Sequence, residues 1–165
     1  MNRVAPRDPR ARDLRSPVML FALGFGSGLA PRGPGTAGTV VGVLLYLAIA
    51  PLPASLHATV LVLVVLAGIP VCGRAARRLG QHDHGAIVWD EIAGFLVTMI
   101  GLPSGPAWLV AGFAMFRVLD IAKPWPISWI DRRLSGGFGI MADDLLAGAA
   151  ACVALNLVRL ALGGP

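Results

Sequence analysis

Five of the nine acidic residues in this 165-residue chain lie inside or at the edge of apolar runs. They are Asp90, Glu91, Asp120, Asp143 and Asp144. A carboxylate in such surroundings is costly unless it is paired with a cation or bound to a metal ion. Oxygen ligands suit a hard cation, and Mg²⁺ is the usual one where phosphate is handled. The residue types and their positions therefore predict a metal or catalytic centre.

Individually, these acids also have ordinary structural explanations. Asp143 and Asp144 could stand at a helix N-terminus, where the helix dipole favours acids, and for this pair alone neither explanation is favoured. Asp120 could pair with Arg117 or Lys123, each one turn away on the same helix face. Five separate coincidences would be needed, however, so we interpret the acids together as one centre.

The elements that must position these acids are apolar helices. Hydrophobic residues make up 56% of the chain and charged residues 14%, whereas soluble domains carry about 25% charged residues. A chain with so little charge is better suited to a bilayer than to water. We therefore predict an all-α fold, a multi-span transmembrane helical bundle with about five spans. The runs long enough to consider as spans are 38–53, 57–72, 86–102, 106–122 and 143–162.

The positions of the basic residues predict how the bundle is oriented. The segments 1–16, 73–85 and 123–139 hold eleven of the fourteen Arg and Lys residues, whereas the alternate connections hold none. By the positive-inside rule the three basic segments are cytoplasmic, which brings all five acids to the cytoplasmic ends of three helices. We expect 1–16 to be a disordered Arg-rich tail and 17–165 to form a single membrane-embedded domain.

A Gly/Pro-rich segment at 24–39 precedes the first predicted span. Six glycines and two prolines in sixteen residues are incompatible with a helix interior, so we predict a re-entrant or interfacial loop. Glycines let backbone N–H groups face an anion, and a following helix N-terminus would favour phosphate. Arg32 and Thr36 are candidate phosphate ligands in this segment. The alternative is a turn that serves only helix packing.

Four motifs, in order, resemble those of phosphatidylglycerophosphatase A, a family of bacterial inner-membrane enzymes. They read GFGSGLAPRGPGT at 24–36, HDHGAIVWDEIAG at 82–94, FRVLDIAKPWPI at 116–127 and GGFGIMADDLLAG at 136–148. The resemblance implies Mg²⁺-dependent removal of the terminal phosphate of phosphatidylglycerophosphate, which yields phosphatidylglycerol. It also implies a multi-pass protein of the inner membrane with its site facing the cytoplasm.

Matched motif by motif, the resemblance assigns roles to the charged residues. The expected catalytic acids are Asp90, Glu91, Asp120, Asp143 and Asp144. Of these, Asp90, Glu91, Asp143 and Asp144 are expected to hold Mg²⁺, while Asp120 completes the metal shell or orients Lys123. Lys123 and Arg117 are expected to bind phosphate together with Arg32 and Thr36 of the Gly/Pro-rich segment, and His82, Asp83 and His84 are possible outer supporting residues. Without the resemblance, the HDHG motif would be interpreted as an exposed polar loop. We expect water to be the nucleophile, and a carboxylate nucleophile stays open as the alternative.

Other classes of function remain as alternatives. Intramembrane acids and broken helices also occur in ion or phosphate transporters, but here the acids gather at one membrane face and no internal repeat is present. A phosphatase of another lipid phosphate is the second alternative. The net charge of +5 suits anionic lipid head groups better than nucleic acid, given the hydropathy of the chain.

Overall fold

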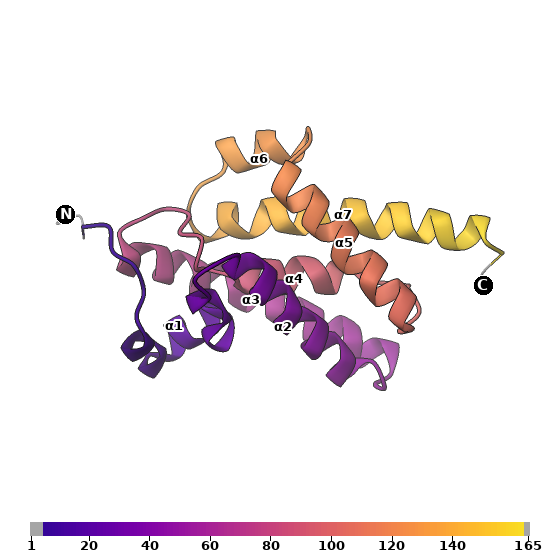
Figure 1. The fold of residues 1–165 in the computed structure, drawn as a ribbon, viewed down its shortest axis with the longest axis horizontal. Helices are drawn as coiled ribbons and strands as arrows, with labels where there is room; N and C mark the ends of the chain where they lie inside the picture. Colours follow the sequence, from indigo (N-terminus) through magenta and orange to yellow (C-terminus); the bar gives the residue numbers. More distant parts are fainter. Residues whose placement is uncertain (1–4, 164–165) are drawn as a thin grey trace.

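A computed structural model describes residues 5–163, which form helices and no strand (Figure 1). The prediction of an all-α chain is therefore confirmed. The elements are the 3₁₀ helix η1 (Ala11–Arg15), α1 (Pro17–Ala22), the 3₁₀ helix η2 (Gly24–Leu29), α2 (Pro34–Ile49), α3 (Ala54–Leu79), α4 (Trp89–Thr98), α5 (Pro106–Ala122), α6 (Ile127–Arg133) and α7 (Gly136–Ala161).

The short helix α4 is the centre of the bundle, because it packs against α2, α3, α5 and α7. Eight of its ten residues are buried, with Ile92 and Phe95 fully so. Small residues set its distance from α7: a Cβ at Gly148 would collide with the carbonyl of Gly94. The indole of Trp89 donates a hydrogen bond of 3.0 Å to a carbonyl of α3. These contacts hold the start of α4 firmly between its neighbours.

Two helices, α3 and α7, are long and apolar enough to cross a bilayer. Each has 26 residues, which correspond to about 39 Å at the α-helical rise. The other predicted spans give shorter helices: α2 has 16 residues, α5 has 17 and α4 only ten. The number of five spans therefore stays a prediction.

The boundaries of the long helices differ from those predicted. The helix α3 continues through the basic stretch at 73–79, and α7 begins seven residues before the apolar run at 143. Hydropathy detects only the part of a helix that faces lipid or core, whereas a helix continues through Arg and Gly where packing supports it. Here a Cβ at Gly137 would collide with the carbonyl of Ile69, so the glycines of α7 serve its contact with α3.

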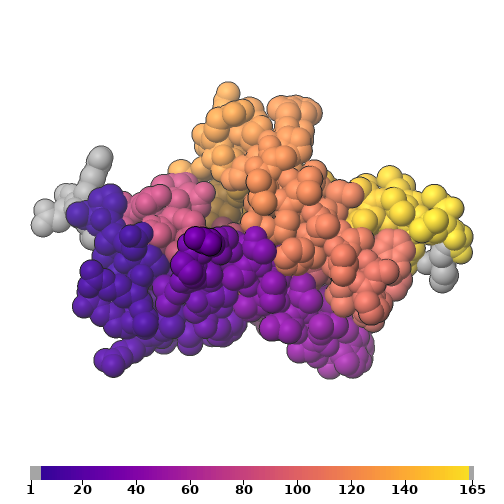
Figure 2. Space-filling model, in the orientation of Figure 1, coloured from indigo at the N-terminus to yellow at the C-terminus, as the bar shows by residue number. Residues whose placement is uncertain are grey.

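Many large apolar side chains of α2, α3, α5 and α7 are exposed on the outside of the bundle. Figure 2 shows one face of the molecular surface in the orientation of Figure 1. A soluble monomer rarely exposes so much contiguous apolar surface, so this surface agrees with a membrane environment. The most exposed of these side chains on α3, α5 and α7 are Leu63, Leu66, Val110, Val118, Ile121, Val153 and Leu157, each at 60% or more.

The N-terminal segments fold along one end of α3. The backbone N–H of Arg7 donates to the carbonyl of Leu79 at 3.0 Å, and the Arg7 guanidinium pairs with Asp13 at 2.8 Å. This hydrogen bond holds the pKa of Asp13 at about 2, below its ordinary value. The segment 17–30 forms α1 and η2, where Met19 and Leu23 are buried. The predicted domain boundary and the re-entrant character of this segment stay predictions.

Candidate active site

Three carboxylates, two buried and one partly buried, meet where α4 and α7 pack together. Asp90 and Glu91 lie in the first turn of α4, and Asp144 lies two turns into α7. An oxygen from each of these three side chains lies within 4.8 Å of the other two. Asp90 is 6% exposed and Asp144 4%, so little water is available to separate the like charges. A cation bound between these carboxylates would balance their charges.

The cluster fits a hard divalent cation. All its donor atoms are carboxylate oxygens, which are the ligands that Mg²⁺ prefers. Glu91 Oε2 is buried and has no hydrogen-bond partner among the described residues. A buried oxygen without a donor is costly, and a metal ion would satisfy it. Asp90, Glu91 and Asp144 are therefore the residues of this structure that could hold Mg²⁺.

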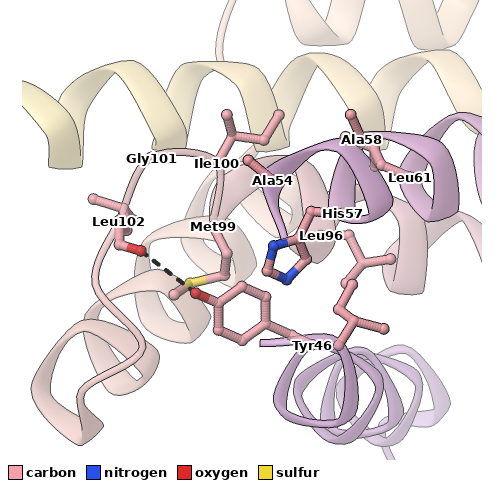
Figure 3. Close-up of a pocket in the computed structure, with 11 residues that line it drawn as sticks. Tyr46, Ala54, His57, Ala58, Leu61, Leu96, Met99, Ile100, Gly101 and Leu102 are labelled. Carbon is pink, nitrogen blue, oxygen red and sulfur yellow. Dashed lines mark hydrogen bonds between the residues drawn. The ribbon is translucent and has the colours of Figure 1, made fainter. Parts of the chain in front are cut away.

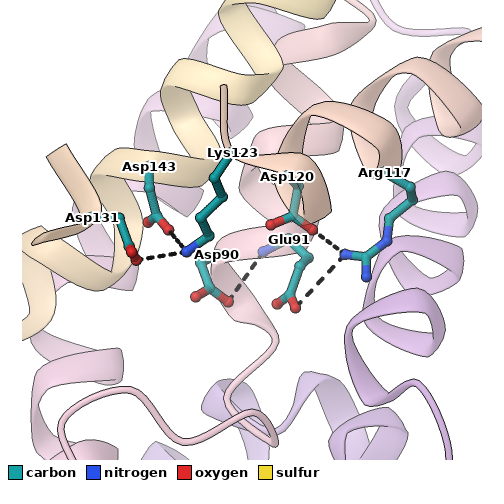
Figure 4. Close-up of polar contacts among 7 residues, drawn as sticks. All are labelled: Asp90, Glu91, Arg117, Asp120, Lys123, Asp131 and Asp143. Atoms are coloured by element: carbon teal, nitrogen blue, oxygen red, sulfur yellow. Dashed lines mark hydrogen bonds and ion pairs between the residues drawn. The ribbon is translucent and has the colours of Figure 1, made fainter. Parts of the chain in front are cut away.

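A guanidinium from α5 lies on one side of this cluster (Figure 4). Arg117 Nη1 donates a hydrogen bond to Asp120 and lies 3.9 Å from Glu91 Oε1. From the sequence, an ion pair with Arg117 was one ordinary structural explanation for finding Asp120 in an apolar run, and the structure contains that pair. It also gives Asp120 a role, because that carboxylate aims the guanidinium at the cluster. Arg117 Nε is buried without a partner in residues 5–163.

An ammonium group lies on the other side of the cluster (Figure 4). Lys123 follows the last residue of α5 and has a left-handed backbone, with φ 41°. Its Nζ donates to Asp143 Oδ2 and to Asp131 Oδ1, each at 2.6 Å. Partial burial lowers the pKa of Lys123, but these hydrogen bonds outweigh that effect and its pKa is raised. Lys123 therefore stays protonated.

The predicted four-acid metal site is thus divided in two by the structure. Asp143 is outside the group that could share one ion, and its carboxylate contacts Lys123 instead. Adjacent helical residues point about 100° apart, so Asp144 faces α4 while Asp143 faces Lys123. Because α7 begins at Gly136, neither acid is in the first helical turn. The explanation by a helix N-terminus is therefore wrong for this pair.

Two residues of the site escaped the sequence interpretation. Asp131 lies in the basic segment 123–139 and is not one of the five acids in apolar runs, but α6 returns it to Lys123. Gly35, in the first turn of α2, touches the cluster: a Cβ there would collide with Glu91 Oε1 and lie 3.1 Å from Arg117 Nη1. The abundance of glycine at 24–39 was the available signal, although it did not single out this position.

The remaining predicted residues have other surroundings. Arg32 and Thr36 are exposed on either side of the start of α2. His82 Nε2 accepts a hydrogen bond of 2.6 Å from the backbone N–H of Gly136, which anchors the start of α7. His84 Nε2 lies 3.3 Å from Asp8 of the tail, and the carbonyl of Asp83 accepts from Gln81. Within residues 5–163, these side chains make no hydrogen bond to the carboxylate cluster.

A separate cavity of about 270 Å³ lies at the other end of α4 (Figure 3). Its walls are mostly apolar, and the imidazole of His57 stacks on the ring of Tyr46 with a centroid distance of 6.1 Å. On this side the cavity is lined by Leu96 and by Met99 to Leu102 at and beyond the end of α4, whereas Asp90 and Glu91 lie in the first turn of α4. It is therefore distinct from the charged site.

Comparison with known proteins agrees with the sequence motifs. The profile of the family phosphatidylglycerophosphatase A matches residues 20–159. A protein of that name from Escherichia coli strain K12 is 45% identical over 136 residues, which are 82% of this chain and 79% of the relative. Its namesake from Haemophilus influenzae is 42% identical over 151 residues, covering 88% of this chain and 91% of the relative.

A third relative has a different name. A protein from Bacteroides thetaiotaomicron, provisionally named a phosphatidylinositol-3-phosphatase, is 33% identical over 153 residues, covering 88% of this chain and 95% of the relative. No solved structure matches the chain. The profile includes the carboxylate cluster and both flanking cations, and the chain belongs to the phosphatidylglycerophosphatase A family.

Proposed function

We propose that this protein hydrolyses the terminal phosphate ester of phosphatidylglycerophosphate, giving phosphatidylglycerol and inorganic phosphate in phospholipid biosynthesis. The observation that carries the proposal is the cluster of Asp90, Glu91 and Asp144 between the cations of Arg117 and Lys123, in a chain of this family. Phosphoryl transfer depends mainly on positioning and on neutralising the phosphate charge. Acids that hold a metal ion, flanked by two cations, supply both.

In the proposed reaction, the oxygen of water bonds to phosphorus, the bond from phosphorus to the glycerol oxygen breaks, and a proton lost by the water is taken up by the glycerol oxygen. Asp90, Glu91 and Asp144 would hold Mg²⁺, which would supply Lewis acidity toward the phosphoryl oxygens and the water. Arg117 and Lys123 bind the phosphate oxygens, and Asp120 holds Arg117 in place. Gly35 lets the first turn of α2 approach Glu91, so that free backbone N–H groups of that turn lie near the phosphate.

We place the site at the cytoplasmic face of the bacterial inner membrane. The long helices α3 and α7 have the length and composition of membrane spans. Basic residues end α3 and α6, and these two helices precede the acids of α4 and α7 in the sequence. The positive-inside rule predicts such residues at a cytoplasmic face. A lipid in the inner leaflet could then present its phosphate to the cluster while its acyl chains stay in the bilayer.

Another lipid phosphate is a second candidate substrate. The name of the relative from Bacteroides thetaiotaomicron refers to phosphatidylinositol 3-phosphate, and that lipid also carries a phosphate monoester. The carboxylates and cations of this site act on the phosphate and do not distinguish the alcohol to which it is bound. The test must therefore compare the two lipids directly.

The test is phosphate release by the purified protein in detergent. We expect release from phosphatidylglycerophosphate with Mg²⁺, loss of release in EDTA, and recovery when Mg²⁺ is restored. A preference for phosphatidylinositol 3-phosphate would replace the first substrate by the second. A transporter would release no phosphate from either lipid, and that result would refute the proposal.

A further inference from the structure

We infer that Asp131 is a positioning residue of the active site, which holds the ammonium of Lys123 in place for the substrate phosphate. The inference rests on the proposed function, since it assigns Lys123 to phosphate binding. Asp131 belongs to α6, a seven-residue helix that follows Lys123. The carboxylate of this helix turns back toward Lys123, and Oδ1 accepts a hydrogen bond of 2.6 Å from Nζ.

The geometry makes Lys123 the junction of three helices. Lys123 follows α5, Asp131 comes from α6 and Asp143 comes from α7, and Nζ donates to both carboxylates at 2.6 Å. An ammonium has three N–H groups, so one is left for a substrate oxygen. Two fixed acceptors determine the direction of the third N–H, whereas one acceptor would leave the group free to rotate.

The two carboxylates of this junction differ in burial. The side chain of Asp143 is 8% exposed and lies beside the cluster, whereas that of Asp131 is 35% exposed at the outer edge. Asp143 alone would draw the ammonium inward, onto the acids. Asp131 counteracts this pull from the outside, which is the side from which a lipid phosphate arrives. Without Asp131, the four-carbon stem of Lys123 would keep rotamer freedom that it must lose when the substrate phosphate binds.

The test measures phosphate release by wild type and by Asp131→Asn, which keeps the size of the side chain and removes its charge. Because Lys123 contacts phosphate in the ground state and the transition state alike, we expect KM to rise about tenfold while kcat stays within about threefold. Asp131→Glu keeps the carboxylate and should restore most of the loss. Asp13→Asn is the matched control: it removes an ion-paired carboxylate, on Arg7, away from the site, and should leave KM unchanged.

A double-mutant cycle with Lys123→Met separates positioning from a merely structural role. If Asp131 acts through Lys123, Asp131→Asn adds no further loss in the Lys123→Met protein. If Asp131 only holds α6 on the bundle, its effect is the same with or without the lysine, and the inference is overturned. Equal KM values for wild type and Asp131→Asn would overturn it as well.

A second measurement keeps this inference separate from the proposed substrate. Calorimetric titration with inorganic phosphate needs no turnover, and we expect Asp131→Asn to weaken phosphate binding about tenfold. If the wild type hydrolyses neither lipid, the proposed function fails, and the same cycle on phosphate binding still decides the role of Asp131. Wild type that neither hydrolyses lipid phosphate nor binds phosphate would overturn both.

Discussion

Gly35→Ala is the smallest change expected to disable the site without unfolding the protein. The new methyl group would collide with Glu91 Oε1 and would lie 3.1 and 3.2 Å from the two terminal nitrogens of Arg117. Glu91 must retreat by roughly 1 Å to restore an ordinary contact. A displacement of that size costs about 100-fold in rate, which corresponds to about 2.7 kcal/mol of transition-state stabilisation. We therefore expect kcat/KM to fall about 100-fold.

The stability of Gly35→Ala should change much less than its activity. Gly35 lies in the first turn of α2 and has no positive φ, so alanine adds no backbone strain there and the strain is confined to the contact with Glu91. The assay is phosphate release together with thermal unfolding in the same detergent. Gly105→Ala is the matched control, because a Cβ there meets no atom within 4 Å. A folded Gly35→Ala protein with wild-type kcat/KM would refute the proposed placement of Glu91 against α2.

Three further predictions follow from the charged contacts. Asp144→Asn should raise the Mg²⁺ concentration needed for half-maximal activity at least tenfold, as loss of a metal contact does. Asp143→Asn should instead raise KM for the lipid and leave the Mg²⁺ requirement nearly unchanged. Titrations of both variants with Mg²⁺ and with lipid check this difference. Arg117→Lys keeps the charge but not the planar guanidinium, so KM should rise about tenfold in steady-state kinetics. The hydrogen bond from Arg7 lowers the pKa of Asp13 to about 2, so this ion pair stabilises the fold above the ordinary pKa of Asp, and the effect is lost as pH falls through 2. Asp13→Asn should therefore lower the melting temperature slightly near pH 6, and thermal melts should show this difference vanishing toward pH 2.

Much of the helical architecture was predictable because apolar runs and basic segments have a direct physical meaning. The run at 106–122 has the same bounds as α5, the run at 57–72 lies within α3, and the run at 38–53 lies largely in α2. The run at 86–102 is apolar for a reason other than contact with lipid. Its helix, α4, is apolar because protein surrounds it on all sides, and a buried helix can be as hydrophobic as one that faces lipid. Hydropathy alone does not separate these two cases.

The residue types of the candidate site were predictable from the sequence, but the sequence did not predict which acids meet one another and which acid contacts Lys123. Five acids were expected to converge, and the structure brings Asp90, Glu91 and Asp144 together. The contact between Lys123 and Asp131 depends on the turn between α5 and α6, in which Lys123 has a left-handed backbone. No periodic pattern encodes such a turn, and the polar sequence around Asp131 resembles an ordinary exposed loop. The role of that acid therefore became visible only in three dimensions.

The two adjacent acids of α7 explain how one motif can serve both halves of the site. A pair of neighbouring residues on a helix faces two different partners, because the side chains diverge by about 100°. Asp144 meets the acids of α4, and Asp143 meets Lys123. Any shift of α7 therefore moves the proposed metal ligand Asp144 together with Asp143, the partner of the proposed phosphate-binding residue Lys123. The close approach of Gly94 and Gly148 fixes that helix against α4, and a site that must hold a cation and a phosphate at one fixed separation requires such a rigid connection.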